Sequence, residues 1–356
     1  MLRRSMILSL IRRALYFTVS AVHAVPHLKS KKGTRMKHLK TLKILTLAAA
    51  VTLCGGMLSG CGGSKSDALT IVTTVYTTYD FAKQLTAHYE KPVEVKLLLT
   101  PGGECHSYEP TPSDAAAIQS CDLFIYIGGT SETWAEKLIE TSRTKKKNLR
   151  MFDCVDLLNE ETVEGMEPEE HEDEHEEGHA DEIDEHIWTA PLNADKMLTA
   201  MQESLNEIAP KEKEHCDASY ESLHNSLLKL DQRAREIHDN AKRDTLIFAD
   251  RFPFRYLTEA YGWNYYAAFA GCSSDTDASP ATLSFLISKV KDENIKTVFY
   301  LENSSQKIAN AVSAATGAQA VMLQSCNNVS RMDYDVGMHY QQLMTENLDA
   351  IEEALN

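Results

Sequence analysis

Short apolar runs alternate with segments of helical spacing along most of the chain. Runs rich in β-branched residues predict strands, and residues recurring every three to four positions predict helices. In the first half, strands are predicted at 69–75, 93–99, 123–127 and 151–155, with helices at 80–89, from Asp114 onward with Ser113 as N-cap, and at 134–141. In the second half, strands are predicted at 245–249, 265–269, 296–301 and 319–323, with helices at 256–261, 280–294, 306–316 and 334–355. This alternation favours parallel sheets in an α/β fold.

A long helical segment separates the two halves. A helix at 193–208 stops at Pro210, and the run 211–242 then continues without Gly or Pro. Leu223, Leu227 and Leu230 recur there at three- and four-residue steps, and thirty helical residues span about 45 Å. The sequence therefore predicts two similar α/β lobes joined by one rigid helix. Ligands in such folds bind at the carboxyl ends of strands, which places the expected site between the lobes.

Residues 160–185 form an acidic tract with fifteen Asp or Glu and no Lys or Arg. Like charges at this density repel, so the tract is not expected to form a core. His171, His175 and His179 lie within it, and His186 follows at the start of an ordered-looking IWTAP segment. Imidazole and carboxylate together bind divalent metals, so the tract is interpreted as a metal-binding loop. The alternative is a solvated acidic linker with incidental histidines.

The formal net charge of −16 conceals an asymmetry between the start of the chain and the rest. Residues 1–60 hold eleven Lys or Arg and no acid, which leaves 25 basic residues against 52 acidic ones, a net charge of −27, for the remainder. Nucleic-acid binding requires a basic patch, so the body is not expected to bind nucleic acid. An acidic body instead suits a protein that attracts cations.

The start of the chain has the order of a bacterial lipoprotein signal. Lysines follow Met36, an apolar stretch runs over 44–53, and Leu58-Ser59-Gly60-Cys61 resembles a lipobox, in which the Cys is lipidated. Cys61 is therefore the expected lipidation site, and the chain is expected on the extracytoplasmic face of the cell membrane. Residues 1–35 fit this pattern poorly, and we interpret Met36 as the true start. The other cysteines show no CxxC spacing, and any disulfide pairing among them is left open.

The boundaries expected along the chain follow from these features. They are an upstream extension at 1–35, a lipoprotein signal peptide at 36–60, a flexible tether at 61–67, an N-terminal α/β lobe at 68–159, an acidic His-rich loop at 160–185, the end of the N-terminal lobe at 186–210, a linking helix at 211–242 and a C-terminal α/β lobe at 243–356.

Four polar residues near the ends of predicted strands or of the acidic tract are candidate metal ligands. They are His106, His186, Asp250 and Glu302. Each has an alternative interpretation. His106 could be a surface turn residue, Asp250 could form an ion pair with Arg251 or Arg255, and Glu302 could cap the next helix.

Several motifs together resemble the zinc- and manganese-specific solute-binding lipoproteins of bacterial ABC importers. The resemblance covers nearly all of residues 67–356, and its most specific parts are PGGECHSYEPTPSD with CDLFIYIGG and ETW, then EHIWTAPLNA, then FADRFPFRYLTEAYG. It implies two α/β lobes joined by a rigid helix, with the metal between them. It also implies that His106 is the first ligand and His186 the second. The His-rich acidic loop is typical of the zinc branch.

The third and fourth ligand positions depart from the family pattern. Where zinc members usually have a third His, this chain has Ala249, followed by Asp250. The family's acidic position falls near LQSCNN, which contains no carboxylate. Asp250 is the expected third ligand, and a loop histidine, Glu302, Cys326 or water would complete a tetrahedral site.

The functional hypothesis is capture of Zn²⁺ between the lobes and delivery to an ABC permease and its ATPase subunit. The chain is not expected to be an enzyme, and it carries no GxxxxGK[ST] run of its own. The alternatives are a manganese-binding importer component, with Mn²⁺ as the ligand, and a lipid-anchored zinc hydrolase, although no HExxH motif is present. A further alternative is a surface protein for cell adhesion or zinc buffering.

Overall fold

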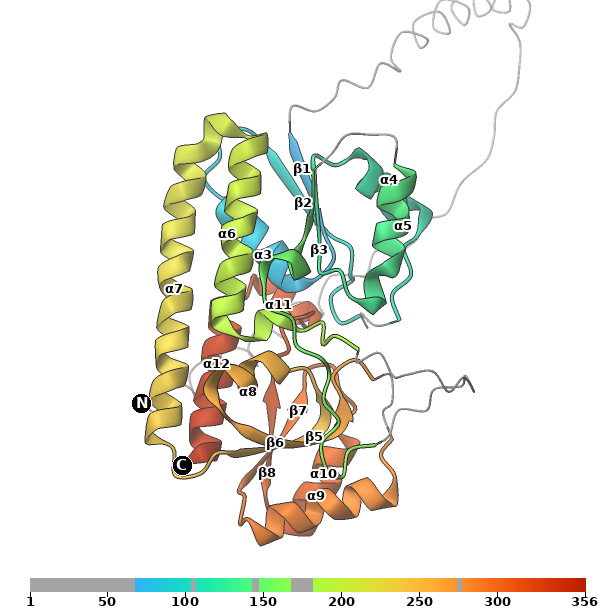
Figure 1. The fold of residues 1–356 in the computed structure, drawn as a ribbon, viewed down its shortest axis with the longest axis vertical. Coiled ribbons are helices and arrows are strands. Elements are labelled where there is room, and N and C mark those ends of the chain that lie inside the picture. The colour runs from blue at the N-terminus through green and yellow to red at the C-terminus, as the bar shows by residue number, and fades with distance from the viewer. Residues whose placement is uncertain (1–67, 104–106, 143–146, 168–181, 274–276) are drawn as a thin grey trace, which may run out of the picture. The chain divides into compact units, whose positions relative to one another are not determined.

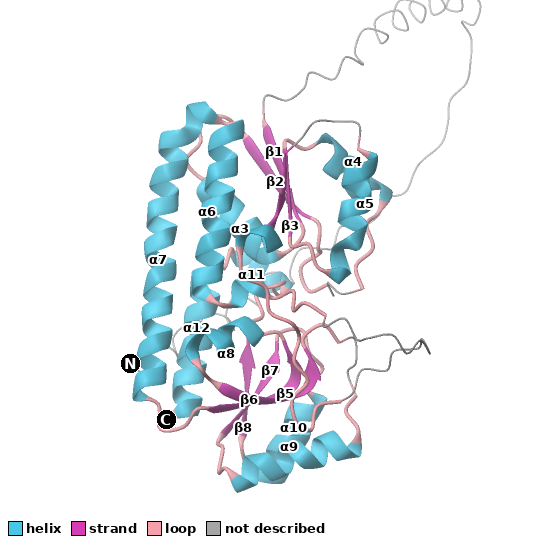
Figure 2. Ribbon diagram, viewed as in Figure 1, coloured by secondary structure: helices cyan, strands magenta, loops and turns pink. Residues whose placement is uncertain are grey.

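The computed structural model describes residues 68–103, 107–142, 147–167, 182–273 and 277–356, which belong to one compact unit that begins at Lys65. Two four-stranded sheets, each with helices packed against it, form an N-terminal and a C-terminal lobe (Figure 1, Figure 2). The strand orders are β2-β1-β3-β4 and β6-β5-β7-β8, and every pairing between named strands is parallel. The predicted fold class is therefore confirmed.

In the described ranges, the N-terminal lobe contains four short strands with α-helices packed against them. Its strands are β1 (Leu69–Thr73), β2 (Val93–Leu97), β3 (Leu123–Tyr126) and β4 (Lys147–Arg150), and its helices are α3 (Tyr76–Leu85), α4 (Pro112–Ser120) and α5 (Thr133–Thr141). All four residues of β3 are buried, as expected for a central strand covered on both faces.

The C-terminal lobe repeats the same strand order. Its strands are β5 (Thr245–Phe252), β6 (Asn264–Ala270), β7 (Thr297–Leu301) and β8 (Gln319–Leu323), and its helices are α8 (Arg255–Tyr261), α9 (Pro280–Asp292), α10 (Lys307–Thr316), α11 (Arg331–Val336) and α12 (Tyr340–Leu355). The order in which the chain adds strands reverses between β1 and β3 in the first sheet and between β5 and β7 in the second. A crevice is expected at the carboxyl ends of the strands at such a point.

Three local predictions were wrong. The strand predicted at 151–155 is displaced: β4 ends at Arg150, opposite the end of β3 at Tyr126, and the apolar residues Met151–Cys154 form a 3₁₀ turn. The N-cap of α4 is Thr111, whose hydroxyl accepts a hydrogen bond from the N–H of Asp114, because Pro112 already occupies the first helical turn. The closing helix predicted at 334–355 is two helices, since Gly337 has a left-handed φ of 69° and ends α11.

Helix α7 (Lys213–Asn240) connects the lobes and confirms the predicted long helix. Its 28 residues span about 42 Å, and in Figure 1 it runs beside α6 (Pro191–Ile208) at the N-terminal lobe and beside α12 at the C-terminal lobe. One stripe of the helix is buried against these neighbours: Leu223, Leu227, Leu230, Ala234 and Ile237. Each buried Leu contributes about 2 kcal/mol of hydrophobic stabilisation, so the helix is held along its length.

A turn after β8 also joins the two lobes. The N–H of Tyr76 donates to the carbonyl of Asn327 (2.8 Å), and the hydroxyl of Thr77 donates to the carbonyl of Cys326 (2.7 Å). The indole of Trp188 donates to the carbonyl of Ser325 (2.8 Å). Cys326 has a left-handed φ of 60°, an uncommon conformation for a residue with a side chain. The turn is therefore held in a strained form by hydrogen bonds from the N-terminal lobe.

A second connection, which we call the crossing segment (residues 158–167), leads into the acidic tract. Asn159 in this segment pairs with Ile183, near the end of the acidic tract, through an antiparallel bridge. The segment then crosses to the C-terminal lobe, where the N–H of Glu167 donates to the carbonyl of Ala268 on β6 (2.9 Å). Met166 is buried in the core. Backbone pairing and the burial of Met166 therefore hold the two described ends of the acidic tract against the lobes.

Among the helices that the structure describes within 68–356, none combines the length and apolar composition needed to cross a bilayer. The cysteines in the described ranges form no disulfide with one another, and they are Cys121, Cys154, Cys216, Cys272 and Cys326.

Candidate metal centre

His186 is the predicted ligand that the structure places most clearly. Only 2% of its surface is exposed, and its ring Nδ1 lies 3.1 Å from Oδ1 of Asp184, which also accepts the backbone N–H of His186 (2.8 Å). A carboxylate at Nδ1 holds the neutral ring in the tautomer that leaves Nε2 with its lone pair. Burial lowers the pKa of His186, but the charges of Asp184, Glu185 and Glu160 outweigh this and raise it overall.

Packing fixes the ring of His186 in place. A Cβ added at Gly271 would lie 3.2 Å from the ring atoms Cε1 and Nδ1 and 2.8 Å from the carbonyl oxygen of Phe252. The ring also meets the indole of Trp188 edge to face, with centroids 5.6 Å apart. The glycine thus allows the C-terminal lobe's backbone to approach the histidine closely.

A cavity of about 220 Å³ between the lobes, the interlobe cavity, brings His186 and Glu302 together. The N-terminal lobe contributes Gly102 and Gly103 to its wall, and the C-terminal lobe contributes polar side chains that follow its strands. The lining residues are Gly102, Gly103, His186, Arg251, Pro253, Gly271, Leu301, Glu302, Asn303, Ser325, Asn327 and Asn328. This position confirms that the carboxyl ends of the strands face the space between the lobes.

Glu302 follows β7 directly, as predicted, and is 7% exposed. Its Oε2 accepts the N–H of Ser325 (2.8 Å), and its Oε1 accepts the hydroxyl of the same residue. Burial raises the pKa of Glu302 to about 7, against the opposing effect of those hydrogen bonds and of the Arg251 charge. A cation in the cavity would favour the ionised carboxylate.

Asp250 occupies a different place from the one expected. The strand predicted at 245–249 continues to Phe252, with a register shift between Phe248 and Arg251, so Asp250 lies within β5. Its Oδ1 accepts the N–H of Arg251 (2.9 Å), and its Oδ2 accepts the N–H of Leu301 on β7 (3.1 Å). The carboxylate therefore bridges two strands, and Asp250 is not among the residues that line the interlobe cavity.

Other candidate residues fall outside the described ranges or away from the cavity wall. His106, the loop histidines His171, His175 and His179, and Cys61 all lie outside the described residues. Gly103, three positions before His106, lines the interlobe cavity. Cys326 is buried, and its thiol lies 3.7 Å from the carbonyl oxygen of Gln324. Within the described residues, no three His, Cys, Asp or Glu side chains converge as a metal site.

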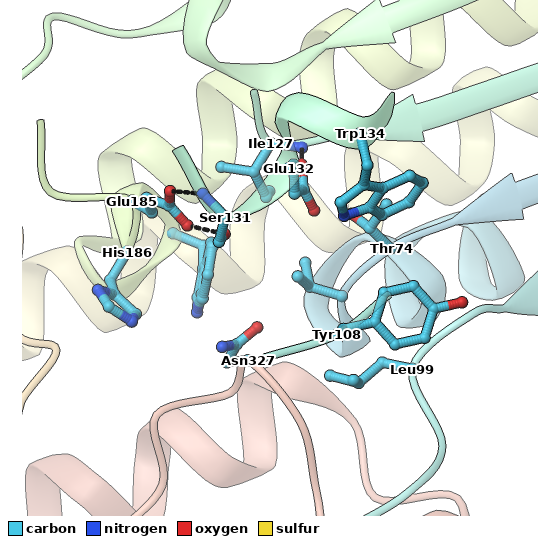
Figure 3. A pocket seen from close by; sticks show the side chains of 12 residues that line it. Thr74, Leu99, Tyr108, Ile127, Ser131, Glu132, Trp134, Glu185, His186 and Asn327 are labelled. Atoms are coloured by element: carbon cyan, nitrogen blue, oxygen red, sulfur yellow. Dashed lines mark hydrogen bonds between the residues drawn. The ribbon is translucent and has the colours of Figure 1, made fainter. Parts of the chain in front are cut away.

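A smaller cavity of about 20 Å³ touches His186 from the N-terminal lobe (Figure 3). Glu185 accepts the N–H of Ser131 (2.8 Å) and its hydroxyl, and Glu132 accepts the N–H groups of Ile127 (2.6 Å) and Gly128 (2.9 Å). Burial raises the pKa of Glu132 to about 7. This volume holds roughly one water molecule, so the cavity is too small for an organic ligand.

Sequence reasoning missed two features of the site. Asp184 was counted only as one acid of the tract, although a carboxylate two residues before a proposed ligand His is a recognisable signal for an orienting partner. Arg251 was considered only as an ion-pair partner for Asp250, and its position in the cavity wall depends on the register shift in β5. Arg255 pairs instead with Glu259 (2.8 Å) and Glu161 (3.3 Å).

Residues 71–354 match the family described as the periplasmic component A of the zinc-uptake complex. The chain belongs to this family. Its members are binding components of a transport system rather than enzymes. The resemblance inferred from the motifs is therefore confirmed.

Two relatives define how far the similarity extends. The chain is 33% identical over 316 residues to the zinc-binding lipoprotein AdcA of Streptococcus pneumoniae, covering 88% of this chain and 61% of AdcA. It thus spans about three fifths of that relative's length. It is 32% identical over 312 residues to the high-affinity zinc uptake system protein ZnuA of Bacillus subtilis, covering 86% of this chain and 93% of that one.

Solved structures agree with this assignment. The Zn(II)-bound ZnuA-like domain of Streptococcus pneumoniae AdcA matches with a TM-score of 0.66 and 30% identity, over 81% of this chain and 98% of the domain. The metal-dependent lipoprotein YcdH of Bacillus subtilis matches with a TM-score of 0.67 and 28% identity, over 81% of this chain and 100% of that one. The laminin-binding protein Lmb of Streptococcus agalactiae, at 23% identity and a TM-score of 0.66, covers 81% of this chain and 100% of its own and shares the fold.

Proposed function

We propose that this chain is the extracytoplasmic zinc-binding component of an ABC importer, which captures Zn²⁺ between its lobes and delivers it to a membrane permease. The observation that carries the proposal is a cavity between the lobes lined by both His186 and Glu302, in a chain of the zinc-uptake family. Buried imidazole and carboxylate groups are suitable zinc ligands, and the relatives AdcA and ZnuA are named for zinc binding and zinc uptake.

In this proposal His106 and His186 provide two nitrogen ligands. Glu302 is favoured over Asp250 as the carboxylate, because Glu302 lines the interlobe cavity and Asp250 does not. The histidines of the acidic tract raise the local zinc concentration. Protons compete for all these ligands, so zinc affinity should fall as pH falls.

The setting of the protein belongs to the same proposal. Lipidated Cys61 anchors it to the membrane, and the permease and its ATPase subunit take up the ion that it releases. The His-rich tract favours zinc over manganese, because imidazole suits zinc and oxygen ligands suit manganese. A hydrolase would in addition need an open zinc position beside a general base.

Calorimetric titration of residues 62–356 with Zn²⁺ and with Mn²⁺ tests this function. We expect zinc binding to be lost in His106→Ala and His186→Ala, reduced in Glu302→Gln and little changed in Asp250→Ala. His215→Ala is the matched control, because that histidine is 42% exposed on α7. Deletion of 168–181, which spares the bound ends of the tract, should leave one tight site.

Two outcomes would overturn parts of the proposal. If zinc binding persists in His186→Ala but disappears with the tract deletion, the tract is the metal site and the interlobe proposal fails. If Mn²⁺ binds more tightly than Zn²⁺, the protein is the manganese component instead. Melting curves of each variant separate loss of a ligand from loss of the fold.

A further inference from the structure

Ser325 holds the carboxylate of Glu302 at both oxygens. The N–H of Ser325 donates to Oε2 of Glu302 (2.8 Å), and the hydroxyl of Ser325 donates to Oε1. The N–H of Asn327 donates to the oxygen of the same hydroxyl (3.2 Å), which leaves the hydroxyl hydrogen for Glu302. Two donors on one residue, one to each oxygen, fix both the position and the plane of a carboxylate. Since each carboxylate oxygen has two acceptor sites, Glu302 can still bind a cation.

The backbone on both sides of Ser325 is held by other elements. The N–H of Gln324 donates to Oδ1 of Asn347 on α12 (2.8 Å), and the amide of Asn347 donates back to the carbonyl of Gln324 (2.8 Å). On the other side, the carbonyl of Cys326 accepts the hydroxyl of Thr77 on α3 (2.7 Å). Ser325 is itself buried and lies in the wall of the interlobe cavity. Its two donor groups are therefore fixed by the turn around them.

The carbonyl of Ser325 reaches toward the other proposed ligand. It accepts the indole N–H of Trp188 (2.8 Å), and the indole meets the ring of His186 edge to face. Trp188 is buried, so this contact is shielded from water. One residue thus contacts Glu302 directly and supports His186 through Trp188. Groups that hold metal ligands in this way set the geometry that the ion meets.

We propose that Ser325 is a positioning residue for zinc, which orients the carboxylate of Glu302 toward the ion in the interlobe cavity and ties this ligand through Trp188 to His186. The inference rests on the proposed function and assigns to it a residue that acts through the ligands. Substitution of groups that orient metal ligands typically lowers metal affinity about 10- to 100-fold.

Zinc titration calorimetry of residues 62–356 tests the inference. We expect Ser325→Ala to weaken zinc binding about 10- to 100-fold. Ser204→Ala is the matched control, because this buried serine lies on α6 and is not among the residues that line the interlobe cavity. Circular dichroism confirms that each variant is folded, and Ser325→Gly, which also removes the hydroxyl, replaces Ser325→Ala if that variant does not fold.

A double-mutant cycle separates positioning of Glu302 from a general loosening of the turn. In Glu302→Gln the carboxylate is absent, so adding Ser325→Ala should weaken zinc binding by no more than about twofold, the usual scatter for independent changes. A merely structural role would weaken zinc binding by the same factor in both backgrounds. The visible absorption of bound Co²⁺ depends on the arrangement of its ligands, so the bands should shift in Ser325→Ala and stay unchanged in Ser204→Ala.

The outcomes separate this inference from the proposed function. Unchanged zinc affinity in Ser325→Ala would overturn the inference, as would an equal loss in both backgrounds or an unchanged Co²⁺ spectrum. Zinc bound as tightly by Glu302→Gln as by the wild type would overturn it too, while zinc binding by the protein would stand. Absence of zinc binding by the wild type would overturn the proposed function itself.

Discussion

Gly271→Ala tests whether the packing around His186 controls metal affinity. Gly271 does not have a left-handed φ, so any cost comes from the new methyl group alone. That carbon would lie 2.8 Å from the carbonyl oxygen of Phe252 and 3.2 Å from two ring atoms of His186. The carbonyl belongs to β5 and cannot move cheaply, so the ring must shift by a few tenths of an ångström. Overpacking of this kind costs about 1–3 kcal/mol of stability.

Displacement of a ligand ring should also weaken metal binding, by about 10- to 100-fold, as seen when groups that orient a ligand are changed. Urea denaturation without metal measures the first effect, and zinc titration calorimetry measures the second. Gly317→Ala is the control, because no atom lies within 4 Å of its new methyl group. Since φ at this residue is 81°, the substitution should lower the free energy of unfolding by about 1 kcal/mol through backbone strain and leave zinc affinity unchanged. Equal zinc affinity in Gly271→Ala and wild type would refute the assignment of His186 as a ligand held by this contact.

Three further changes probe buried groups. Folding raises the pKa of Glu132 from 4.5 to about 7, so between these values the folded protein binds a proton that the unfolded chain has lost. The contribution of this group to stability should therefore fall by about 3 kcal/mol as pH rises through that window. In Glu132→Gln, urea denaturation at several pH values should show this contribution removed, while that of Glu302, whose pKa is also raised to about 7, remains. Asp184→Asn should lower the pKa of His186, which an NMR titration of the free protein measures. It should also weaken zinc binding about 10- to 100-fold, measured by calorimetry. An unchanged pKa of His186 would contradict its contact with Asp184. Trp188→Phe removes the indole N–H that donates to the carbonyl of Ser325. The free energy of unfolding, measured by urea denaturation, should fall by about 1–3 kcal/mol. An unchanged stability would mean that water replaces the indole as the donor.

The layout of the fold was predictable because each local pattern agreed with the architecture. The rhythm of strands and helices predicted two parallel sheets, and the leucine stripe of α7 predicted the long helix. Errors arose where tertiary contacts decide. The apolar run from Met151 reads as a strand, yet it lies beyond the end of its partner strand and turns.

The candidate site was predictable only where a residue follows the end of a strand without irregularity. Glu302 meets that condition and lies in the cavity wall. Asp250 does not meet that condition, because β5 has a register shift and continues past this residue. As a result, the carboxylate of Asp250 accepts backbone N–H groups, and Arg251 lines the cavity instead. A one-residue irregularity leaves no reliable trace in a hydrophobic pattern. The polar character of neighbouring positions could not show which side chain would face the ligand.

Because of the crossing segment, more than one part of the chain holds the two lobes together. Glu167 is bound to the edge of the second sheet, Glu182 is bound to Thr130 beside the first, and α7 connects the lobes independently. A single peptide-bond cleavage between these two glutamates would therefore leave two chains that remain associated as one particle. If the chain is anchored outside the cytoplasm, as proposed above, it would keep both halves of its cavity after such a cut.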